Sequence, residues 1–356
     1  MYKERVKDAI EAIKKGEMII IMDDEDRENE GDLVMAGIFS TPQKINFMAQ
    51  EARGLICVSI TQDIAKKLDL PPMVQKNDSN HETAFTISID AKEAKTGISA
   101  YERDMTIRLM CDNNAKPSDF VRPGHIFPLI AKEGGVLVRT GHTEASVDIC
   151  KLAGLAPISV ICEIMKKDGT MAGRGDKFLL DFAKEHSLKI LYVSDIIQYR
   201  LNFENLLQES SRERVVFMGV NVEKYTFIDH LGRTHVAFGF IADKKPADSS
   251  PSSASKPLIR FHNIRSDLEL LQNDEEFSAL TKSIQYLKEQ GGYLVFLNGE
   301  EPNKSCAEMK DFGVGAQILK RLNVEDFALL SSCGANKSQY HALSGFNLHL
   351  VEKIEV

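Results

Sequence analysis

Residues 18–36 read Met-Ile-Ile-Ile-Met-Asp-Asp-Glu-Asp-Arg-Glu-Asn-Glu-Gly-Asp-Leu-Val-Met-Ala. Seven carboxylates and one arginine occupy the ten positions 23–32. Such a density of like charge normally marks a solvated loop or a disordered tail, because mutual repulsion opposes packing. Here, however, short apolar runs at 18–22 and 33–36 flank the acidic segment, and such runs are typical of buried strands. We therefore expect an acidic loop held between two strands of a core sheet.

Carboxylates gathered in one loop need a nearby cation to offset their repulsion, and the usual candidates are a divalent ion, an arginine or both. Carboxylate oxygens suit Mg2+ or Mn2+. Arg27, which is planar and always charged, suits a phosphate group or can brace the acids. Composition alone leaves a metal site and an exposed acidic loop equally open.

The whole chain has the size and composition of a soluble protein with two domains. Its 356 residues suffice for two hydrophobic cores. A net charge of -8 offers no general attraction to nucleic acid or to an anionic membrane. The sequence has neither an apolar run of about 20 residues nor a signal peptide, so we expect a cytoplasmic protein that does not bind a membrane.

The six cysteines show neither paired metal-ligand spacing nor the density of a disulfide scaffold, and they stand at positions 57, 111, 150, 162, 306 and 333. Most fall in apolar runs, so reduced core thiols are expected. Cys57 could approach an active site, but a structural role is the preferred interpretation.

Periodicity in the first 200 or so residues predicts a mixture of helices and strands. Helices are expected at 3–15, 42–53, 176–186 and from 99 and 194 onward. Strands are expected at 18–22, 33–36, 55–60, 84–90, 136–138, 157–165 and 189–193. Residues 76–81 are polar and are a candidate mobile lid, residues 122–125 are expected to form a turn, and residues 204–214 a connection.

A second polar segment, Arg139-Thr140-Gly141-His142-Thr143-Glu144, precedes the helical residues 145–152. The order is a strand, a glycine-containing turn and a helix start. Backbone N–H groups at a helix N-terminus are unsatisfied and carry partial positive charge, so an anion fits there. With Arg139 and two threonine hydroxyls added, a phosphate is the expected ligand.

Three further residues are candidates for chemistry, although a lone histidine is more often structural than catalytic. His142 lies inside the expected phosphate turn, where a metal ligand or a phosphate donor would lie. His125 follows Pro-Gly, so its backbone is rigidly placed. Glu163 lies in an apolar strand, where a carboxylate must be paired, bound to metal or protonated.

The acidic loop resembles the signature loop of the 3,4-dihydroxy-2-butanone 4-phosphate synthase family, which acts early in riboflavin synthesis. Further blocks that resemble this family in order and approximate spacing are residues 68–74, 115–129, 139–145 and 168–172. Together they cover about the first 200 residues. The resemblance implies an α+β fold whose first domain is a mixed sheet flanked by helices. It also implies a divalent-metal-dependent lyase that converts ribulose 5-phosphate to 3,4-dihydroxy-2-butanone 4-phosphate and formate.

The resemblance also implies roles for individual residues, a homodimer with active sites near its interface, and two Mg2+ or Mn2+ ions in each site. The implied metal ligands are Glu28 and His142. The positions that match substrate-binding residues are Arg27, Glu28, Asp32, Arg139, Thr140, Gly141, His142, Thr143 and Glu163. The implied catalytic residues are Asp32, His125 and Glu163.

The second half of the chain shows a strand pattern at 215–220, a turn at 230–233 and a serine- and proline-rich stretch at 244–256, which is expected to be a flexible loop. Blocks at 257–262, 311–319 and 343–346 resemble the GTP cyclohydrolase II family. That family binds catalytic zinc through three cysteines, yet no cysteine lies between Cys162 and Cys306, and Arg265 stands where the first ligand is expected. Without thiolate or imidazole ligands, zinc catalysis has no basis there.

We therefore expect two domains, a synthase domain over residues 1–205 and a cyclohydrolase-like domain over residues 206–356 that has no zinc and no cyclohydrolase activity. Two alternatives stay open. A truly bifunctional enzyme would turn over GTP with zinc, whereas a non-catalytic binding or scaffold protein would not convert ribulose 5-phosphate.

Overall fold

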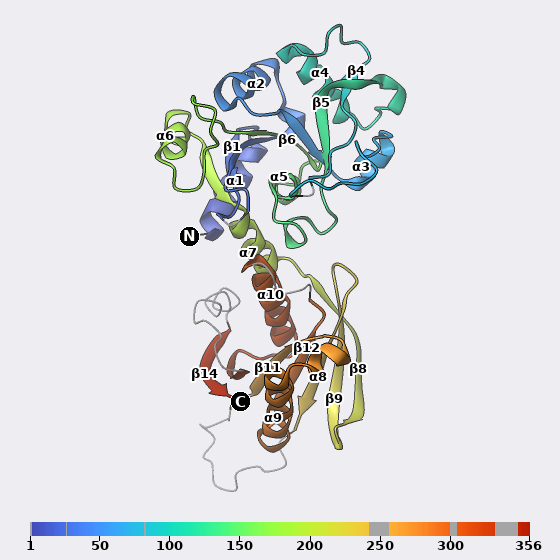
Figure 1. Ribbon diagram of the computed structural model, residues 1–356, viewed down its shortest axis with the longest axis vertical. Coiled ribbons are helices and arrows are strands. Elements are labelled where there is room, and N and C mark those ends of the chain that lie inside the picture. Colours follow the sequence, from blue (N-terminus) through green and yellow to red (C-terminus); the bar gives the residue numbers. More distant parts are fainter. Residues whose placement is uncertain (1, 26, 82, 242–255, 300–304, 332–347) are drawn as a thin grey trace. The chain divides into compact units, whose positions relative to one another are not determined.

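A computed structural model of the chain describes residues 2–25, 27–81, 83–241, 256–299, 305–331 and 348–356, and only the backbone of residues 305–312. The chain forms two compact units, Met1–Tyr199 and Arg200–Val356 (Figure 1). Each unit is built around a sheet of its own.

The first unit is built on a seven-stranded mixed sheet with the order β4-β5-β3-β6-β2-β1-β7. The pairs β1–β7 and β3–β5 are parallel and the others are antiparallel. The strands are β1 (Ile19–Met22), β2 (Gly31–Ala36), β3 (Cys57–Ile60), β4 (Ile89–Ala91), β5 (Phe120–Ile130), β6 (Ile158–Glu163) and β7 (Lys189–Tyr192). The two apolar runs around the acidic loop are therefore neighbouring strands, as predicted.

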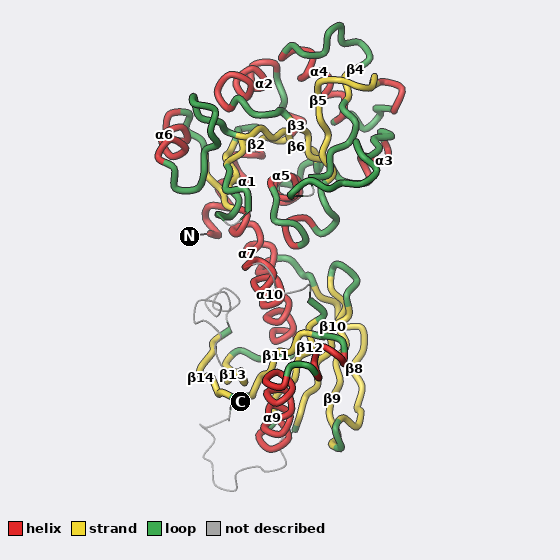
Figure 2. Tube along the Cα trace, in the orientation of Figure 1, coloured by secondary structure: helices red, strands yellow, loops and turns green. Residues whose placement is uncertain are grey.

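Helices cover both faces of this sheet (Figure 2). Their bounds are α1 (Tyr2–Lys14), α2 (Pro42–Phe47), α3 (Gln62–Lys67), α4 (Ala100–Met110), α5 (His142–Leu152), α6 (Lys177–Glu185) and α7 (Val193–Phe203). Helices α1 and α5 pack on one face. Apolar side chains of α2, α3, α4 and α6 share one core cluster with the residues of the other face. Sequence-encoded caps start two of these helices: Thr41 accepts from the Lys44 N–H at 3.3 Å, and Ser99 from the Glu102 N–H at 3.2 Å.

Side chains of β1 and β2 alternate between the two faces of the sheet, and the two faces differ in chemical character. Ile20, Met22, Leu33 and Met35 belong to the core cluster with α2, α3, α4 and α6. The residues between them point to the opposite face, because successive side chains of a strand alternate. Asp32 is one of these, so its carboxylate lies on the face that α1 and α5 cover.

Three expectations about the first unit are wrong in detail. Of the strand predicted at 84–90, only Ile89 and Asp90 belong to a regular strand, which is β4, and Phe85 and Thr86 form single bridges. The predicted turn at 122–125 lies inside β5, where these four residues bulge out because Ile89 pairs with Ile126 and Asp90 with Val121. The strand predicted at 136–138 is a short 3-10 helix (Gly135–Leu137), because Gly134 and Gly135 both have positive φ.

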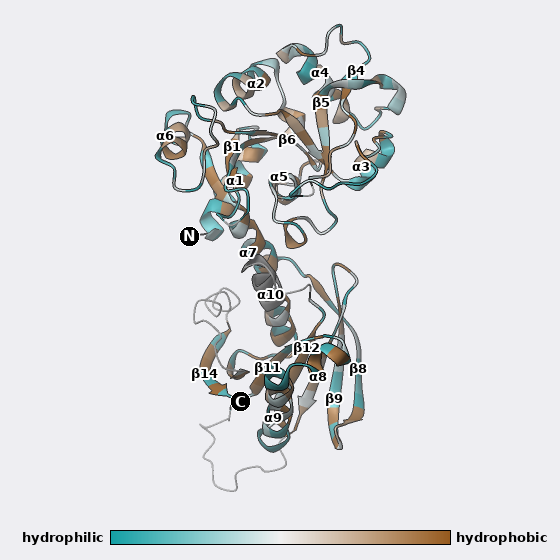
Figure 3. Cartoon of the chain, viewed as in Figure 1, coloured by the Kyte–Doolittle hydropathy of each residue, from teal (hydrophilic) through white to brown (hydrophobic). Residues whose placement is uncertain are grey.

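The second unit also contains a seven-stranded mixed sheet, with the order β14-β13-β11-β12-β10-β9-β8. Its strands are β8 (Leu207–Phe217), β9 (Val220–Asp229), β10 (Thr234–Phe240), β11 (Leu258–Asn263), β12 (Gly292–Leu297), β13 (Asp326–Ser331) and β14 (His349–Glu355). Its helices are α8 (Asp267–Leu271), α9 (Asp274–Gln290) and α10 (Ser305–Arg321). Figure 3 shows the apolar strands against which the amphipathic helix α9 lies.

In this unit, too, the sequence expectations need correction. The connection expected at 204–214 is mostly strand β8, whose charged and exposed residues conceal its periodicity. The strand expected at 215–220 contains a hairpin turn, since Met218 and Gly219 have φ values of 50° and 85°. The turn at 230–233 is confirmed, because the Asp229 N–H donates to the Arg233 carbonyl at 3.0 Å. Apart from Lys256, the stretch at 244–256 lies outside the described residues.

Candidate active site

The predicted site residues converge on a cavity of about 360 Å3 beside β2, β6 and the start of α5. The cavity is lined by Arg27, Glu28, Glu30, Asp32, Cys57, His81, Thr83, Phe85, Leu129, Arg139, His142, Thr143, Ile161 and Glu163. Strand register explains part of this list: Asp32 pairs with Glu163, and Cys57 with Ile161. Paired residues share one face of the sheet, so the two carboxylates enter the cavity side by side.

The acidic loop is folded around a buried carboxylate and is not a solvated segment. Asp23 has no exposed surface, and its two oxygens accept from the Glu28 N–H at 3.2 Å, the Glu30 N–H at 2.8 Å and the Arg27 guanidinium at 2.8 Å. Arg27 also donates to Glu28 at 2.7 Å. Asp23 therefore orients the loop, and Arg27 neutralises part of its charge, as the composition required.

His142 lies against the carboxylates from the first turn of α5. Its Nδ1 is 3.7 Å from Glu28 Oε2, its Nε2 is 3.8 Å from Asp32 Oδ1, and its Nε2 is 3.2 Å from the Glu30 carbonyl. Burial opposes the charge of the ring, but Asp32 and Glu28 outweigh it and raise the pKa of His142 to about 9. Burial likewise opposes the charge of Glu28, yet His142 and Arg27 lower the pKa of this carboxyl to about 2.

Asp32 and Glu163 form the floor of the cavity. Glu163 accepts from the Leu55 N–H at 2.8 Å. Asp32 is buried, and within the described part of the chain its Oδ1 has no hydrogen-bond partner. Burial, together with the negative charges of Glu163 and Glu30, raises the pKa of Asp32 even though His142 opposes the shift.

The donor set of this cavity fits a divalent cation. One ligand atom each from Asp23, Glu28 and His142 lies within 4.8 Å of the others. The unpartnered Oδ1 of Asp32 faces the same His142 ring. The carboxylate oxygens in this set suit Mg2+ or Mn2+, whereas the imidazole is a ligand that softer metals also accept. Asp23 is an addition to the two ligands expected from the sequence, although its oxygens are already engaged within the loop.

The expected phosphate turn forms the rim of the cavity at the start of α5. Gly141 is the N-cap of this helix, and Thr143 lies buried in its first turn. Arg139 donates to Glu144 at 2.6 Å, to Thr83 Oγ1 at 3.0 Å and to the His81 carbonyl at 2.9 Å. Unsatisfied N–H groups and a cation thus meet at one edge, which is the arrangement that binds a phosphate. Thr140 and Gly141 lie in this turn, although neither lines the cavity.

Comparison with known proteins agrees with this geometry. Residues 7–199 match the sequence profile of 3,4-dihydroxy-2-butanone 4-phosphate synthase, which is more than half of the chain. The chain belongs to the 3,4-dihydroxy-2-butanone 4-phosphate synthase family. Residues 301–355 match the profile of GTP cyclohydrolase II. Membership confirms the resemblance drawn from the acidic loop, and it assigns the chain to an enzyme family of riboflavin biosynthesis that catalyses a lyase-type reaction.

Individual relatives support the two-domain architecture. A 3,4-dihydroxy-2-butanone 4-phosphate synthase of Helicobacter hepaticus is 80% identical over 360 residues, which cover 100% of both chains. RibBX, a two-domain 3,4-dihydroxy-2-butanone 4-phosphate synthase from A. baumannii, covers 99% of both chains with 38% identity and a TM-score of 0.80. A synthase crystallised with two magnesium ions covers 56% of this chain and 97% of that one, with 40% identity and a TM-score of 0.52. The predicted two-domain α+β fold is therefore confirmed.

One expected catalytic residue of the synthase family lies elsewhere. His125 is on β5, outside the cavity, and 42% of its side chain is exposed. Its ring contacts Asp90, which is not a cavity residue. The fold of a single chain therefore brings together all of the predicted acids but not this histidine.

Sequence reasoning missed several residues that line the synthase cavity. Strand alternation could have identified Ile161, which faces the same side as Glu163. His81 is the last residue of the loop proposed as a lid, Thr83 lies just beyond it, and no motif marks either. Cys57 lines the cavity, but burial and the charge of Glu163 raise the pKa of its thiol well above the usual value, so the expectation of an inert thiol agrees with the geometry.

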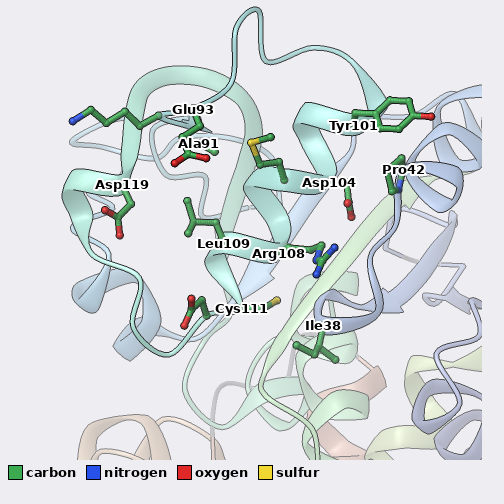
Figure 4. A pocket seen from close by; sticks show the side chains of 13 residues that line it. Ile38, Pro42, Ala91, Glu93, Tyr101, Asp104, Arg108, Leu109, Cys111 and Asp119 are labelled. Atoms are coloured by element: carbon green, nitrogen blue, oxygen red, sulfur yellow. The ribbon is translucent and has the colours of Figure 1, made fainter.

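A larger cavity of about 840 Å3 lies along α4 and contains none of the predicted residues. Figure 4 shows its mixed lining, with Tyr101, Asp104 and Arg108 on α4 and Ile38 across the opening. Size alone would favour this cavity as the active site. Membership of the synthase family and the cluster of charged side chains favour the smaller cavity instead. Among the described residues, no helix combines the length and apolar character needed to cross a membrane.

Proposed function

We propose that this protein converts D-ribulose 5-phosphate to 3,4-dihydroxy-2-butanone 4-phosphate and formate in the cytoplasm. The observation that carries the proposal is the meeting of Glu28, Asp32, His142 and Glu163 in one cavity whose rim is a helix N-terminus with Arg139. A phosphosugar needs an anion site at one end and proton-transfer groups at the other.

The substrate's phosphate binds at the turn from Arg139 to Thr143. The N–H groups of the first turn of α5 and the Arg139 guanidinium donate to its oxygens. The sugar then extends toward Asp32 and Glu163. Arg27 at the opposite wall keeps Glu28 charged and oriented.

The site takes Mg2+ or Mn2+, with two ions in each cavity, and Glu28 and His142 bind them. When bound, such ions polarise the sugar oxygens and stabilise enediolate charge. The fit of the donor set and the two magnesium ions of a homologous synthase support this assignment.

Asp32 and Glu163 move protons during enolisation, loss of water and rearrangement of the carbon skeleton. The raised pKa of Asp32 suits a carboxyl that gains and releases a proton near neutral pH. Both carboxylates enter the same cavity, since the two residues are paired across β2 and β6.

The active enzyme is a homodimer in which His125 of one copy completes the cavity of the other. Two observations support this: His125 lies outside the cavity of its own chain, and its ring is exposed. The family resemblance implies both a catalytic role for this histidine and active sites near an interface.

The decisive experiment measures formate release from ribulose 5-phosphate with Mg2+ and with EDTA. We expect turnover by the wild type that disappears with EDTA. Absence of turnover in folded, Mg2+-loaded protein would leave the scaffold alternative standing.

The dimer is tested by mixing two variants that should each keep only a small residual rate, His125→Ala and Glu163→Ala, under conditions that exchange subunits. A mixed dimer has one cavity with both residues intact, so activity should return to about a quarter of the wild-type rate for random exchange. If the mixture stays inactive although subunits exchange, His125 acts within its own chain or not at all.

We assign the synthase to residues 1–205 and a cyclohydrolase-like domain, inactive toward GTP, to residues 206–356. The two profile matches, which lie on either side of this boundary, support the division. Arg265, at the position expected for the first zinc ligand, pairs with Glu276 at 3.0 Å. Elemental analysis and a GTP assay of the full chain test this, because stoichiometric zinc with GTP turnover would establish a bifunctional enzyme.

A further inference from the structure

The catalytic histidine outside the cavity is held by a single buried carboxylate. Asp90 Oδ2 lies 2.7 Å from His125 Nδ1, and Asp90 Oδ1 accepts from the His125 backbone N–H at 2.8 Å. Only 6% of Asp90 is exposed. One side chain therefore fixes both the backbone and the ring of the same histidine.

This pairing determines which ring nitrogen carries the proton. An ionised carboxylate only accepts hydrogen bonds, so the short contact requires a proton on Nδ1 of His125. The neutral ring then presents the lone pair of Nε2, which can take a proton from a reacting group. Once it does, the carboxylate stabilises the imidazolium, as the aspartate does in serine-protease triads.

The surrounding backbone is shaped to hold Asp90 and His125 together. β4 and β5 are adjacent (Figure 1), and residues 122–125 bulge opposite the step from Ile89 to Asp90. The bulge turns the His125 N–H toward the Asp90 carboxylate instead of toward a ladder partner. The bulge is also held at Gly124, whose N–H donates to Ser88 Oγ at 3.2 Å.

Gly97 completes this arrangement. Its φ is +81°, and a Cβ at this position would overlap Asp90 Oδ2 and lie 2.6 Å from His125 Nδ1. No other residue type fits against the pair without displacing it.

We propose that Asp90 is a positioning residue of the synthase, which fixes the tautomer and orientation of His125 so that Nε2 faces the reacting groups. The inference rests on the proposed catalytic role of His125. It predicts that Asp90 affects the rate only through that histidine.

The test is Asp90→Asn in the full-length, Mg2+-loaded enzyme. The asparagine oxygen can still accept from the His125 N–H, but its amide donates toward Nδ1 and moves the ring proton to Nε2. We expect kcat to fall roughly 100-fold or more with little change in KM. Nitrogen-15 spectra of histidine-labelled protein should change from the Nδ1–H to the Nε2–H form. The matched control is Glu93→Gln, which removes an exposed acid of the neighbouring loop. This variant should leave the kinetic constants and the nitrogen-15 spectra unchanged.

A double variant separates positioning from a general structural effect. In a His125→Ala background, Asp90→Asn should cause no further loss, because its only route to the reaction is gone. A further large loss, or a normal kcat for Asp90→Asn alone, would overturn the inference. If His125→Ala itself keeps the full rate, the proposed role of His125 fails first. If Asp90→Asn does not fold, Gly97→Ala can replace it, because its methyl group would displace Asp90 and His125 from each other. Its effect is then measured with His125 present and in the His125→Ala background.

Discussion

Ionisable side chains gather at one place in each unit, and the two places use them differently. In the synthase cavity, one buried oxygen of Asp32 has no hydrogen-bond partner in the part of the chain that the structure describes, and His142 lies between two carboxylates at distances that leave room for an ion. At the end of β11 in the second unit, Arg265 forms an ion pair with Glu276, and burial beside Arg260 and Arg265 lowers the pKa of His262 to about 4. The first arrangement leaves room for a ligand between its charged groups. In the second, Glu276 is already paired with Arg265, although its Oε2 is buried without a hydrogen-bond partner among the described residues.

This difference shows that the presence of a sheet says little about the chemistry of the residues beside it. The second unit has a seven-stranded sheet and an apolar core of its own. A sequence profile relates residues 301–355 to GTP cyclohydrolase II, but the site residues decide what the unit can do.

The largest effect is expected from Glu28→Gln, which keeps the size of the side chain but removes its charge. The variant should lose both a metal ligand and the charge that pairs with Arg27 and His142. We expect formate release to slow roughly 100- to 1000-fold and to require more Mg2+ for half-maximal rate. Glu25→Gln, in the same loop but 72% exposed, is the matched control. A normal Mg2+ dependence for Glu28→Gln would contradict the assignment of Glu28 as a ligand.

A smaller effect is expected from Arg139→Lys at the phosphate turn. Lysine keeps the positive charge but cannot reproduce the fork that contacts Glu144 and Thr83 together. Losing one charged hydrogen bond to the phosphate should raise KM about 10- to 100-fold with a smaller change in kcat. Arg108→Lys on α4, outside the cavity, is the control, and inorganic phosphate should inhibit the control but not the variant. Equal inhibition of both would show that the phosphate binds elsewhere.

Much of this site could be predicted from sequence, because local pattern determines it. The apolar runs around the acidic loop predicted β1 and β2, and the glycine-containing turn predicted the start of α5, where an anion site remains a prediction. Period-two alternation carries Asp32 and Glu163 to one face once their strands are paired. The family resemblance supplied the residue roles that pattern alone left open.

The features that could not be predicted depend mostly on contacts between residues that are distant in sequence. The bulge at 122–125 arises from the register of β4 against β5, which Pro-Gly in the sequence presents only as a turn. His81 enters the cavity because Arg139, 58 residues away, binds its carbonyl. Strand β8 was missed because its face is charged and exposed, so it lacks the apolar alternation on which strand prediction depends.

The next effect concerns the stability of the second unit against pH. Burial, Arg260 and Arg265 lower the pKa of His262 to about 4, from an unfolded value near 6.5. The unfolded chain therefore binds the proton first, so this contribution is complete above about pH 6.5 and is lost as the pH falls toward 4. The difference between the two pKa values corresponds to at most about 3 kcal/mol in the free energy of unfolding. We expect roughly half of this value, because the ring is not wholly buried.

Hydrogen exchange of peptides from β11 and β12, compared between about pH 7 and pH 5 after correction for the intrinsic rate, measures this loss. His262→Leu should flatten the dependence, whereas His349→Gln, whose parent side chain is 61% exposed, should not. The same pH dependence in His262→Leu would assign the loss to another group.

The smallest effect is expected from Arg265→Ala. This variant tests directly whether the charged residues near the end of β11 differ from those of the synthase cavity in having no catalytic role. The Arg265–Glu276 pair is about one third exposed, so its loss should lower the free energy of unfolding by no more than about 1 kcal/mol. Formate release should be unchanged, and neither wild type nor variant should bind zinc or turn over GTP. Elemental analysis, a GTP assay and chemical denaturation measure the three. If removing Arg265 abolished a GTP-dependent reaction of the wild type, this cation would be part of a working site, and the second unit would have kept a chemistry that its missing cysteines do not reveal.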